Sequence, residues 1–383
     1  MSQESPVAPC LPSIGEIFRT YGRAYLNKYG AQMPTDQIKA MTAIMRCRTL
    51  EAGSVVYRCQ QCQKLHHVLQ SCRNRHCPVC QGSKAKVWLQ KQLEQLLPCP
   101  YFMLTFTVPD EFRQFARSHP RECYQALFEA AKDTLCTLAM DPKYIGSSNL
   151  GFTGVLHTWG RDLNYHPHVH FIVPGGAIAS DGVSWLPSRV DFLVPVRAAS
   201  VIFRAKYKAI MNRIGLVPKI PDVVWAKGWN VNCQAVGDGR LALRYLAPYV
   251  FRVAISNRRI VKVEPGGDGQ GVVTFTVRRS GTSVYKPMSV SAEEFIRRFL
   301  QHVLPSGFQK VRHFGFAHTR AKTNWEWLSM LVTVTLNIVY VLTVTAKAPA
   351  MKRVLLCPEC GGELTCLGFV PSANRRLAEF DTS

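Results

Sequence analysis

The sequence has few acidic residues, and its first residues show no feature of an export signal. It contains 25 Asp and Glu against 47 Lys and Arg among 383 residues, which gives a formal charge of +22 at pH 7. Residues 1–22 have neither a basic start nor an apolar core, so we expect no secretory signal. Internal repeats and low-complexity tracts are also lacking. Because 47% of the residues are apolar and 10% are aromatic, intrinsic disorder is excluded for most of the chain.

The excess of positive charge predicts a polyanionic partner, and nucleic acid is the first candidate. A charge excess without chemistry, as in ribosome-like or heparin-binding proteins, is the alternative. The charge alone does not decide between these two classes.

The 14 cysteines are concentrated in two short segments. Six of them lie between Cys47 and Cys80, and three more lie between Cys357 and Cys366. In a protein that is not exported, clustered cysteines are more typical of metal ligands than of disulfides.

Two Cys-x2-Cys turns in the first segment have the spacing of a zinc ribbon or finger. We expect their four thiolates, Cys59, Cys62, Cys77 and Cys80, to bind one zinc ion, with 14 residues between the two turns. The other candidate ligands nearby are enough for a second site: Cys47, His66, His67, Cys72 and His76. Buried cysteines without a metal are the alternative. The second segment offers only three thiolates (Cys357, Cys360 and Cys366), which predicts an incomplete zinc knuckle.

A row of histidines in a predicted strand is the sharpest catalytic candidate. Residues two apart in a strand project to the same face, so His168 and His170 would lie side by side. Two such imidazoles can hold a divalent cation that keeps open positions for a substrate phosphate. The candidate third ligands are His166, in the same row, and His157, in the preceding strand. A surface strand that happens to carry histidines is the alternative.

The pattern of elements predicts an α+β protein whose central antiparallel sheet is flanked by helices. We expect strands at 101–108, 151–159 and 168–173, and helices at 121–140 and 199–214. The sequence divides into a helical and zinc-binding domain (1–97), a catalytic domain (98–262), a β-hairpin and helix extension (263–320) and a C-terminal apolar, Cys-containing subdomain (321–383). Residues 328–346 are free of charge, but their threonines and Asn337 favour a buried helix or strand pair over a membrane span.

Tyr245 and Tyr249 are four residues apart and would share one face of a helix. The same spacing occurs at Tyr21, Tyr25 and Tyr29, where packing is the expected role, so the spacing alone says little. The surrounding arginines distinguish the second pair, since guanidinium groups bind phosphate bidentately. The arginines expected to contact DNA are Arg244, Arg252, Arg258 and Arg259, together with Arg73 and Arg75 at the border of the zinc segment.

In this order the motifs resemble those of the HUH endonuclease superfamily: the strand 102–107, His168-Val-His170, then Tyr245 and Tyr249. With the cysteine-rich segment 71–80 and the segment 249–257, residues from about 40 to 320 are similar to the insertion sequence ninety-one type of transposase. The resemblance implies an HUH-type catalytic domain preceded by a helical, zinc-ribbon-like domain. It also implies a rolling-circle transposase that nicks and joins single-stranded DNA through a 5′-phosphotyrosine intermediate.

The resemblance further implies that His168 and His170 bind Mg²⁺ or Mn²⁺, that Zn²⁺ is structural, and that Tyr245 and Tyr249 are nucleophiles. Pro248 departs from the pattern. If this proline lies in the first turn of its helix, Tyr245 precedes the helix, so Tyr249 is the preferred nucleophile. The implied partner is single-stranded or hairpin DNA at the ends of a mobile element, in the cytoplasm and associated with the nucleoid. The alternatives are a plasmid replication initiator or relaxase of the same chemistry, and a non-catalytic zinc DNA-binding regulator.

Overall fold

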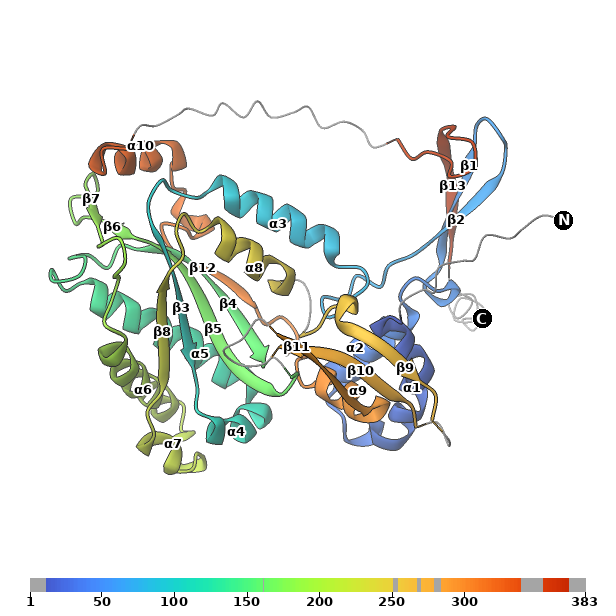
Figure 1. Ribbon diagram of the computed structural model, residues 1–383, viewed down its shortest axis with the longest axis horizontal. Helices are drawn as coiled ribbons and strands as arrows, with labels where there is room; N and C mark the ends of the chain where they lie inside the picture. Colours follow the sequence, from blue (N-terminus) through green and yellow to red (C-terminus); the bar gives the residue numbers. More distant parts are fainter. Residues whose placement is uncertain are drawn as a thin grey trace, which may run out of the picture.

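A five-stranded antiparallel sheet, in the order β12-β4-β5-β3-β8, forms the centre of the molecule (Figure 1). The computed structural model describes residues 12–160, 162–250, 254–266, 270–278, 284–338 and 354–371. The strands of the central sheet are β3 (Tyr101–Thr107), β4 (Gly151–Trp159), β5 (Tyr165–Pro174), β8 (Asn230–Ala235) and β12 (Val311–Gly315). Helices flank this sheet, so the predicted α+β fold with a central antiparallel sheet is confirmed.

One face of the central sheet is covered by four helices: α4 (Arg113–Ser118), α5 (Pro120–Ala139), α6 (Val196–Arg213) and α7 (Val223–Ala226). Alternate residues of the strands point to this face and form an aromatic core. Phe106 of β3, for example, lies 5.6 Å from Phe171 and 5.1 Å from Phe203, measured between ring centroids. Burying each such side chain stabilises the fold by about 1.5–3 kcal/mol.

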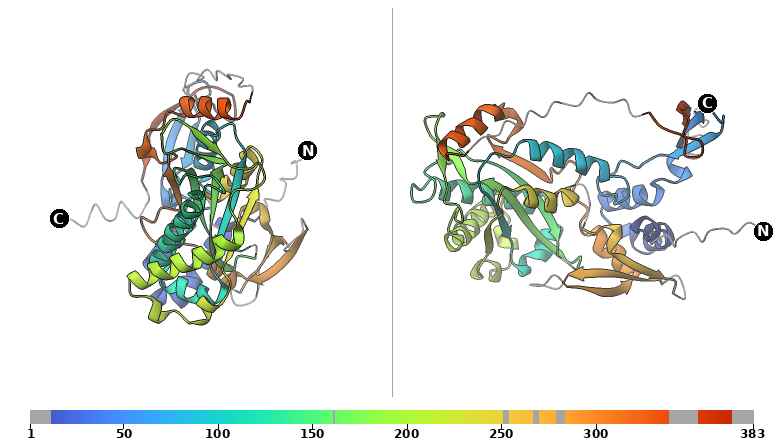
Figure 2. Two further views of the ribbon diagram at one scale, coloured as in Figure 1. Left: turned by 90° about the vertical axis from the view of Figure 1, so that its left-hand side faces the viewer. Right: turned by 45° about the horizontal axis from the view of Figure 1, so that its top comes forward.

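The opposite face of the sheet is covered by α3 (Gly82–Glu94) and α8 (Arg240–Val250), which pack side by side (Figure 2). The buried positions of α8 follow the helical repeat, with Leu243, Leu246 and Val250 on the side that faces the sheet. These residues belong to one apolar cluster with Val155 and Ile172 of the strands. The helix that carries the predicted tyrosines therefore lies over this face.

A second core joins the N-terminal helices to residues much later in the chain. Its elements are α1 (Ile14–Tyr29), α2 (Thr35–Arg46), β9 (Ile260–Glu264), β10 (Val272–Arg278), β11 (Tyr285–Ser291) and α9 (Ala292–Leu300). Phe18 of α1 and Phe299 of α9 make an edge-to-face contact at 5.1 Å. Tyr25 and Tyr29 pack ring against ring at 4.9 Å. The predicted N-terminal domain (1–97) and the predicted extension (263–320) therefore pack together around one core.

The zinc-binding segment and the C-terminal end of the described chain meet in a three-stranded sheet with the order β13-β1-β2 (Figure 1). Its strands are β1 (Ser54–Cys59), β2 (Leu65–Leu69) and β13 (Leu364–Val370). A small hairpin of β6 (Gly176–Ile178) and β7 (Trp185–Pro187) completes the sheets among the described residues.

The predicted apolar stretch 328–346 overlaps α10 (Trp325–Thr335), and residues 339–346 of it lie outside the described residues. Leu328 and Val332 of α10 are buried in the cluster beneath α3 and α8. Among the described residues, every helix is too short or too polar to cross a bilayer.

Candidate functional site

Strands β4 and β5 bring three histidines together on the face covered by α3 and α8. His157 lies opposite His168 in the antiparallel register, and residues directly opposite one another share a face. One nitrogen atom from each of His157, His168 and His170 lies within 4.8 Å of the others. His157 and His170 are buried, whereas His168 is partly exposed. We call these three residues the histidine cluster.

Hydrogen bonds fix the orientation of two of these rings. His168 Nδ1 lies 2.7 Å from the carbonyl oxygen of His166, which can only accept, so Nδ1 carries the proton. His170 Nδ1 lies 2.9 Å from Thr105 Oγ1 of the neighbouring strand β3. An imidazole held through Nδ1 keeps its Nε2 lone pair for a metal ion.

Burial keeps the histidine cluster uncharged. It lowers the pKa of His170 to about 4, and it lowers the pKa of both His157 and His168 well below the usual value, with further lowering by the neighbouring histidines. Neutral imidazoles are the form that binds a cation. Three nitrogen donors at this spacing fit a divalent ion, and they suit a transition metal better than Mg²⁺, which prefers oxygen ligands.

His166 lies outside the histidine cluster, although it shares the strand. Its Nδ1 is 2.6 Å from Arg113 Nη2 and 4.0 Å from the carboxylate of Asp110, so its ring belongs to a separate charged network. Of the two third ligands considered from the sequence, the structure places His157 beside His168 and His170.

Helix α8 includes both predicted tyrosines. It begins at Arg240, so Pro248 lies near its end, and Tyr245 does not precede the helix. Val155, which packs with α8, lies opposite His170, and this contact places α8 above the histidine cluster. Tyr245 is 51% exposed, while the side chain of Tyr249 lies outside the described part of the structure.

The predicted DNA-binding arginines fall into two groups. Arg73, Arg244 and Arg258 are exposed. Arg75 donates hydrogen bonds to the carbonyl oxygens of Phe308 and Pro305, and Arg259 Nε donates to the carbonyl oxygen of Thr276 at 2.8 Å, so these two arginines hold backbone segments in place. Arg252 lies outside the described residues.

The cysteines form two clusters of four, and these correct the grouping predicted from the sequence. One cluster contains Cys47, Cys72, Cys77 and Cys80, and the other contains Cys59, Cys62, Cys357 and Cys360. The two Cys-x2-Cys turns of the first segment therefore do not share a site. The reason is the strand pairing, because β13 runs alongside β1 and brings the C-terminal turn to the end of β1.

The distances between sulfur atoms fit zinc. Cys59 and Cys360 lie 3.4 Å apart, Cys62 and Cys357 lie 3.8 Å apart, and Cys72 and Cys80 lie 3.7 Å apart. Four thiolates at about 2.3 Å from a tetrahedral zinc ion are about 3.8 Å from one another. Burial, with the neighbouring thiolates, raises the pKa of Cys80, so a nearby cation would favour its thiolate form.

The remaining candidates for zinc are outside these clusters. His67 Nδ1 is 3.3 Å from Ser54 Oγ, and His76 Nε2 accepts a hydrogen bond from the amide of Leu304 at 3.0 Å. His66 Nε2 lies 3.3 Å from Cys357 Sγ, at the border of the second cluster. Cys366 is exposed in β13 opposite Tyr57. Of the three thiolates predicted for the C-terminal knuckle, Cys357 and Cys360 belong to a zinc site. The other two ligands of that site are Cys59 of β1 and Cys62 of the turn after it.

The sequence analysis missed two features of the site. Thr105 lies in a strand that was predicted, but its contact with His170 depends on the pairing of β3 with β5. The Gly361-Gly362 pair was a usable signal for a complete zinc knuckle. A Cβ at position 362 would lie 2.8 Å from Gln61 Cβ and 3.1 Å from Cys59 Sγ, so a larger residue would crowd the turn that carries the ligands.

Comparisons with known proteins agree with this arrangement. A family profile described as "Transposase zinc-binding domain" matches residues 17–108, and one described as "Putative transposase" matches residues 151–324. The chain is 37% identical over 336 residues to "Putative transposase y4qJ" of Sinorhizobium fredii, covering 81% of both chains. It is 26% identical over 309 residues to the "Transposase for insertion sequence element IS801" of Pseudomonas savastanoi, covering 74% of this chain and 71% of the relative.

No solved structure matches the chain. Identity at this level over most of both chains establishes the family. The two profiles cover the histidine cluster and the cysteine cluster of Cys47, Cys72, Cys77 and Cys80. The chain belongs to the insertion sequence ninety-one family of transposases.

Proposed function

We propose that this protein is a DNA transposase that nicks and joins single-stranded DNA through a 5′-phosphotyrosine intermediate in rolling-circle transposition. The observation that carries the proposal is the neutral histidine cluster on a sheet face beneath the helix that bears Tyr245 and Tyr249. Membership of the transposase family and the charge of +22 support DNA as the partner.

The histidine cluster is the proposed site of Mn²⁺ or Mg²⁺. When bound there, the ion would neutralise charge on the scissile phosphate and favour in-line attack. The contribution of the chain is to hold the imidazoles neutral and oriented: His168 through the carbonyl of His166, and His170 through Thr105. Partly exposed His168 leaves one side of the cluster open to the substrate.

The proposed cleavage exchanges one phosphoester bond for another. The phenol oxygen of tyrosine bonds to phosphorus and loses its proton, and the bond from phosphorus to the 3′ oxygen breaks, so that this oxygen takes up a proton and leaves as a 3′-hydroxyl. Joining reverses these steps with a different 3′-hydroxyl. Because the phosphotyrosine keeps the energy of the original bond, joining needs no nucleotide cofactor. A second tyrosine allows a second cleavage while the first strand is still attached.

Detection of a covalent adduct tests this proposal. Purified protein is incubated with Mn²⁺ and single-stranded DNA from the ends of its element, and a protein–DNA adduct is then sought on a denaturing gel. We expect Tyr249→Phe to abolish the first adduct while DNA affinity changes less than about twofold, because only the phenol oxygen is lost. Tyr285→Phe, at an exposed tyrosine of β11, is the matched control and should retain the adduct.

Each other outcome has a definite meaning. An adduct that survives Tyr249→Phe but not Tyr245→Phe would transfer the first cleavage to Tyr245. Intact DNA binding without any adduct in the wild type would favour a non-catalytic zinc DNA-binding regulator. Cleavage of a plasmid origin in preference to the ends of the element would favour the replication initiator or relaxase.

A further inference from the structure

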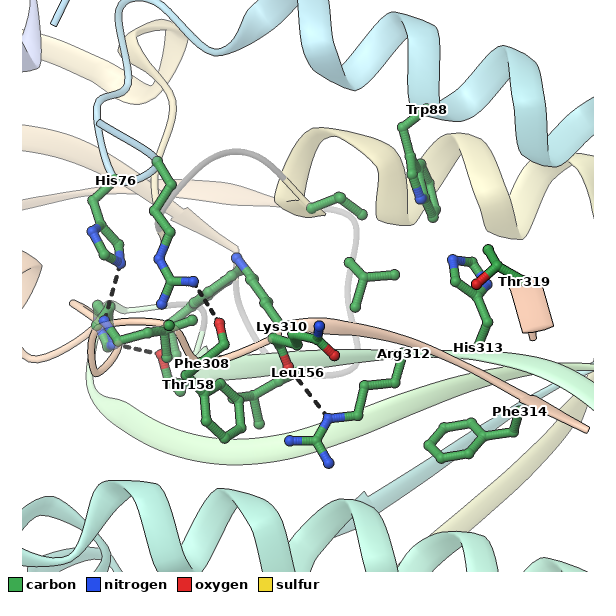
Figure 3. Close-up of a pocket in the computed structure, with 18 of the residues that line it drawn as sticks. His76, Trp88, Leu156, Thr158, Phe308, Lys310, Arg312, His313, Phe314 and Thr319 are labelled. Carbon is green, nitrogen blue, oxygen red and sulfur yellow. Dashed lines mark hydrogen bonds between the residues drawn. The ribbon is translucent and has the colours of Figure 1, made fainter. Parts of the chain in front are cut away.

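A cavity of about 670 Å³ lies at the edge of the central sheet, around the start of β12 (Figure 3). Its walls include the zinc-binding segment, α3, the end of β4, the end of α8, and β12 with the segments on either side of it. The lining residues on which the argument depends are Arg75, Trp88, Trp159, Lys310 and Arg312. The volume is in the range of small-ligand sites, which is about 300–1,000 Å³.

The cavity shares a wall with the histidine cluster. The ring of Trp159 is stacked on the ring of His157, with centroids 4.7 Å apart and an interplanar angle of 22°. Lys310 Nζ lies 4.7 Å from the centre of the same tryptophan ring. A group bound beside Lys310 and Trp159 would therefore be separated from the proposed metal site by a single aromatic ring.

The lining of the cavity is cationic. Arg75 and Lys310 line it, and no Asp or Glu does so among the described residues. Arg312 is also at its border, but its guanidinium lies over the rings of Phe128 and Phe308. Arg75 donates to the carbonyl oxygens of Phe308 and Pro305, and this holds the segment before β12 in place. Burial, with a smaller contribution from Arg75, lowers the pKa of Lys310 to about 7, so an anion in the cavity would favour its charged form.

The cavity also offers an aromatic surface with an unused donor. Trp88 Nε1 is buried and has no hydrogen-bond partner among the described residues. Figure 3 shows that the Trp88 ring extends from α3 into the side of the cavity that is farther from Lys310. A buried indole N–H normally has an acceptor, and leaving it unsatisfied costs about 1–3 kcal/mol. A base carbonyl oxygen that lies in the plane of the Trp88 ring would supply the missing acceptor.

We propose that this cavity holds one nucleotide of the single-stranded DNA next to the cleaved phosphate, with its phosphate at Lys310 and its base against Trp88. The inference rests on the proposed function for the identity of the strand, but not on cleavage itself. It assigns a nucleotide-binding role to Lys310 and Trp88. Supporting roles fall to Trp159, over whose ring Lys310 Nζ lies, and to Arg75, which fixes the segment that carries Lys310.

Photocrosslinking tests the position of the base. Oligothymidylate carrying a single 5-iodouracil is irradiated with the full-length, zinc-loaded protein, and the modified peptide is identified by mass spectrometry. We expect the crosslink on the peptide of Trp88. Trp88→Phe keeps a ring but loses the N–H, and it should lower the yield, whereas Trp327→Phe on α10 should leave it unchanged. Crosslinks found only on other surfaces would overturn the inference.

A lysine pair tests the position of the phosphate. Lys310→Met is nearly isosteric and removes a buried charge, so the variant should fold. We expect it to bind oligothymidylate about fivefold more weakly and to reduce the slope of log K against log salt by about 0.7, as for one lost phosphate contact. Lys208→Met is the matched control, because Lys208 Nζ also lies over a tryptophan ring, Trp225 at 5.5 Å, but on α6 at the opposite face. Equal effects of the two substitutions would contradict the inference.

Failure of this inference and failure of the proposed function give different results. Adduct formation with crosslinks only outside the cavity leaves the transposase chemistry in place and removes the nucleotide site. Crosslinks to Trp88 without any adduct keep the nucleotide site and remove the cleavage chemistry.

Discussion

Metal binding by His168 and His170 through Nε2 depends on what holds the other ring nitrogen, Nδ1. Each ring is held through Nδ1, His168 by the carbonyl oxygen of His166 and His170 by Thr105 Oγ1. Such contacts orient a ligand and fix its tautomer, and losing one typically weakens metal binding 10- to 100-fold. The two contacts differ in one useful way, because only the side chain of Thr105 can be removed by substitution.

We predict that Thr105→Val lowers the affinity of the histidine cluster for Mn²⁺ by about tenfold. Valine has nearly the same shape as threonine but cannot accept the Nδ1 proton, so the ring of His170 loses its fixed orientation. Isothermal titration of the zinc-loaded protein with Mn²⁺ measures the change. Thr107→Val is the matched control. Thr107 lies in β3, like Thr105, and is opposite His168, but among the described residues it makes no hydrogen bond to the histidine cluster. Equal affinities in the wild type and Thr105→Val would contradict the role of this contact.

At the residue scale, the sequence could predict those parts of the site that depend on local geometry. His168 and His170 share a face because strand residues alternate, and this holds for any pairing. The choice between His157 and His166 was open because it depends on the register of β4 against β5, which no local pattern encodes. Thr105 could not be found for the same reason, since β3 and β5 are separated by about 60 residues of chain.

At the scale of elements, the strands and helices were predictable and their partners were not. The strands at 101–108 and 151–159 appear as β3 and β4, and the helices at 121–140 and 199–214 appear as α5 and α6. The zinc ligands were grouped wrongly because nearest neighbours in sequence were taken as nearest neighbours in space. Cys59 and Cys360 are 301 positions apart and meet only because β13 pairs with β1. Pro248 was considered for the first turn of its helix, because proline disrupts a helix interior, but it lies near the end of α8.

We predict that the protein binds two zinc ions and that Cys357→Ser binds about one. The substitution removes a ligand from the cluster of Cys59, Cys62, Cys357 and Cys360, while the other cluster has no residue from the C-terminal segment. Metal analysis of the purified variant counts the ions. The β1-β2-β13 sheet should also become sensitive to protease, because structural zinc contributes directly to folding free energy in so small a unit.

The control for this prediction is Cys366→Ser. Cys366 lies in β13, close in sequence to the cluster, but it is exposed and is not one of its members. It should keep both ions. Two ions in Cys357→Ser would show that His66, whose Nε2 lies 3.3 Å from Cys357 Sγ, replaces the missing thiolate.

At the scale of the whole molecule, the positive charge predicts the kind of partner, and the packing of the layers determines which face that partner can contact. Helices α5 and α6 cover one face of the sheet, and α3 and α8 cover the other (Figure 1). The aromatic core lies on the first face and the histidine cluster on the second. Exposed Arg73 and Arg244 belong to the zinc-binding segment and to α8. The composition alone predicted a polyanion as partner, but it could not say which face the polyanion contacts, because that depends on how the layers stack.

We predict that binding of single-stranded DNA weakens steeply with salt and that the arginines above the histidine face account for part of the slope. For about six phosphate contacts the affinity should fall about 300-fold between 50 and 200 mM salt, because each contact releases about 0.7 of a counterion. Fluorescence anisotropy with oligothymidylate measures this slope. Arg244→Gln, on α8, should reduce it by about 0.7. Arg204→Gln, on α6 behind the aromatic core, should leave it unchanged, since Arg204 Nη1 donates to the carbonyl oxygen of Lys227 and lies on the other face. A flat salt response in the wild type would contradict phosphate recognition altogether, and an equal loss in both variants would show that the strand is not confined to the histidine face.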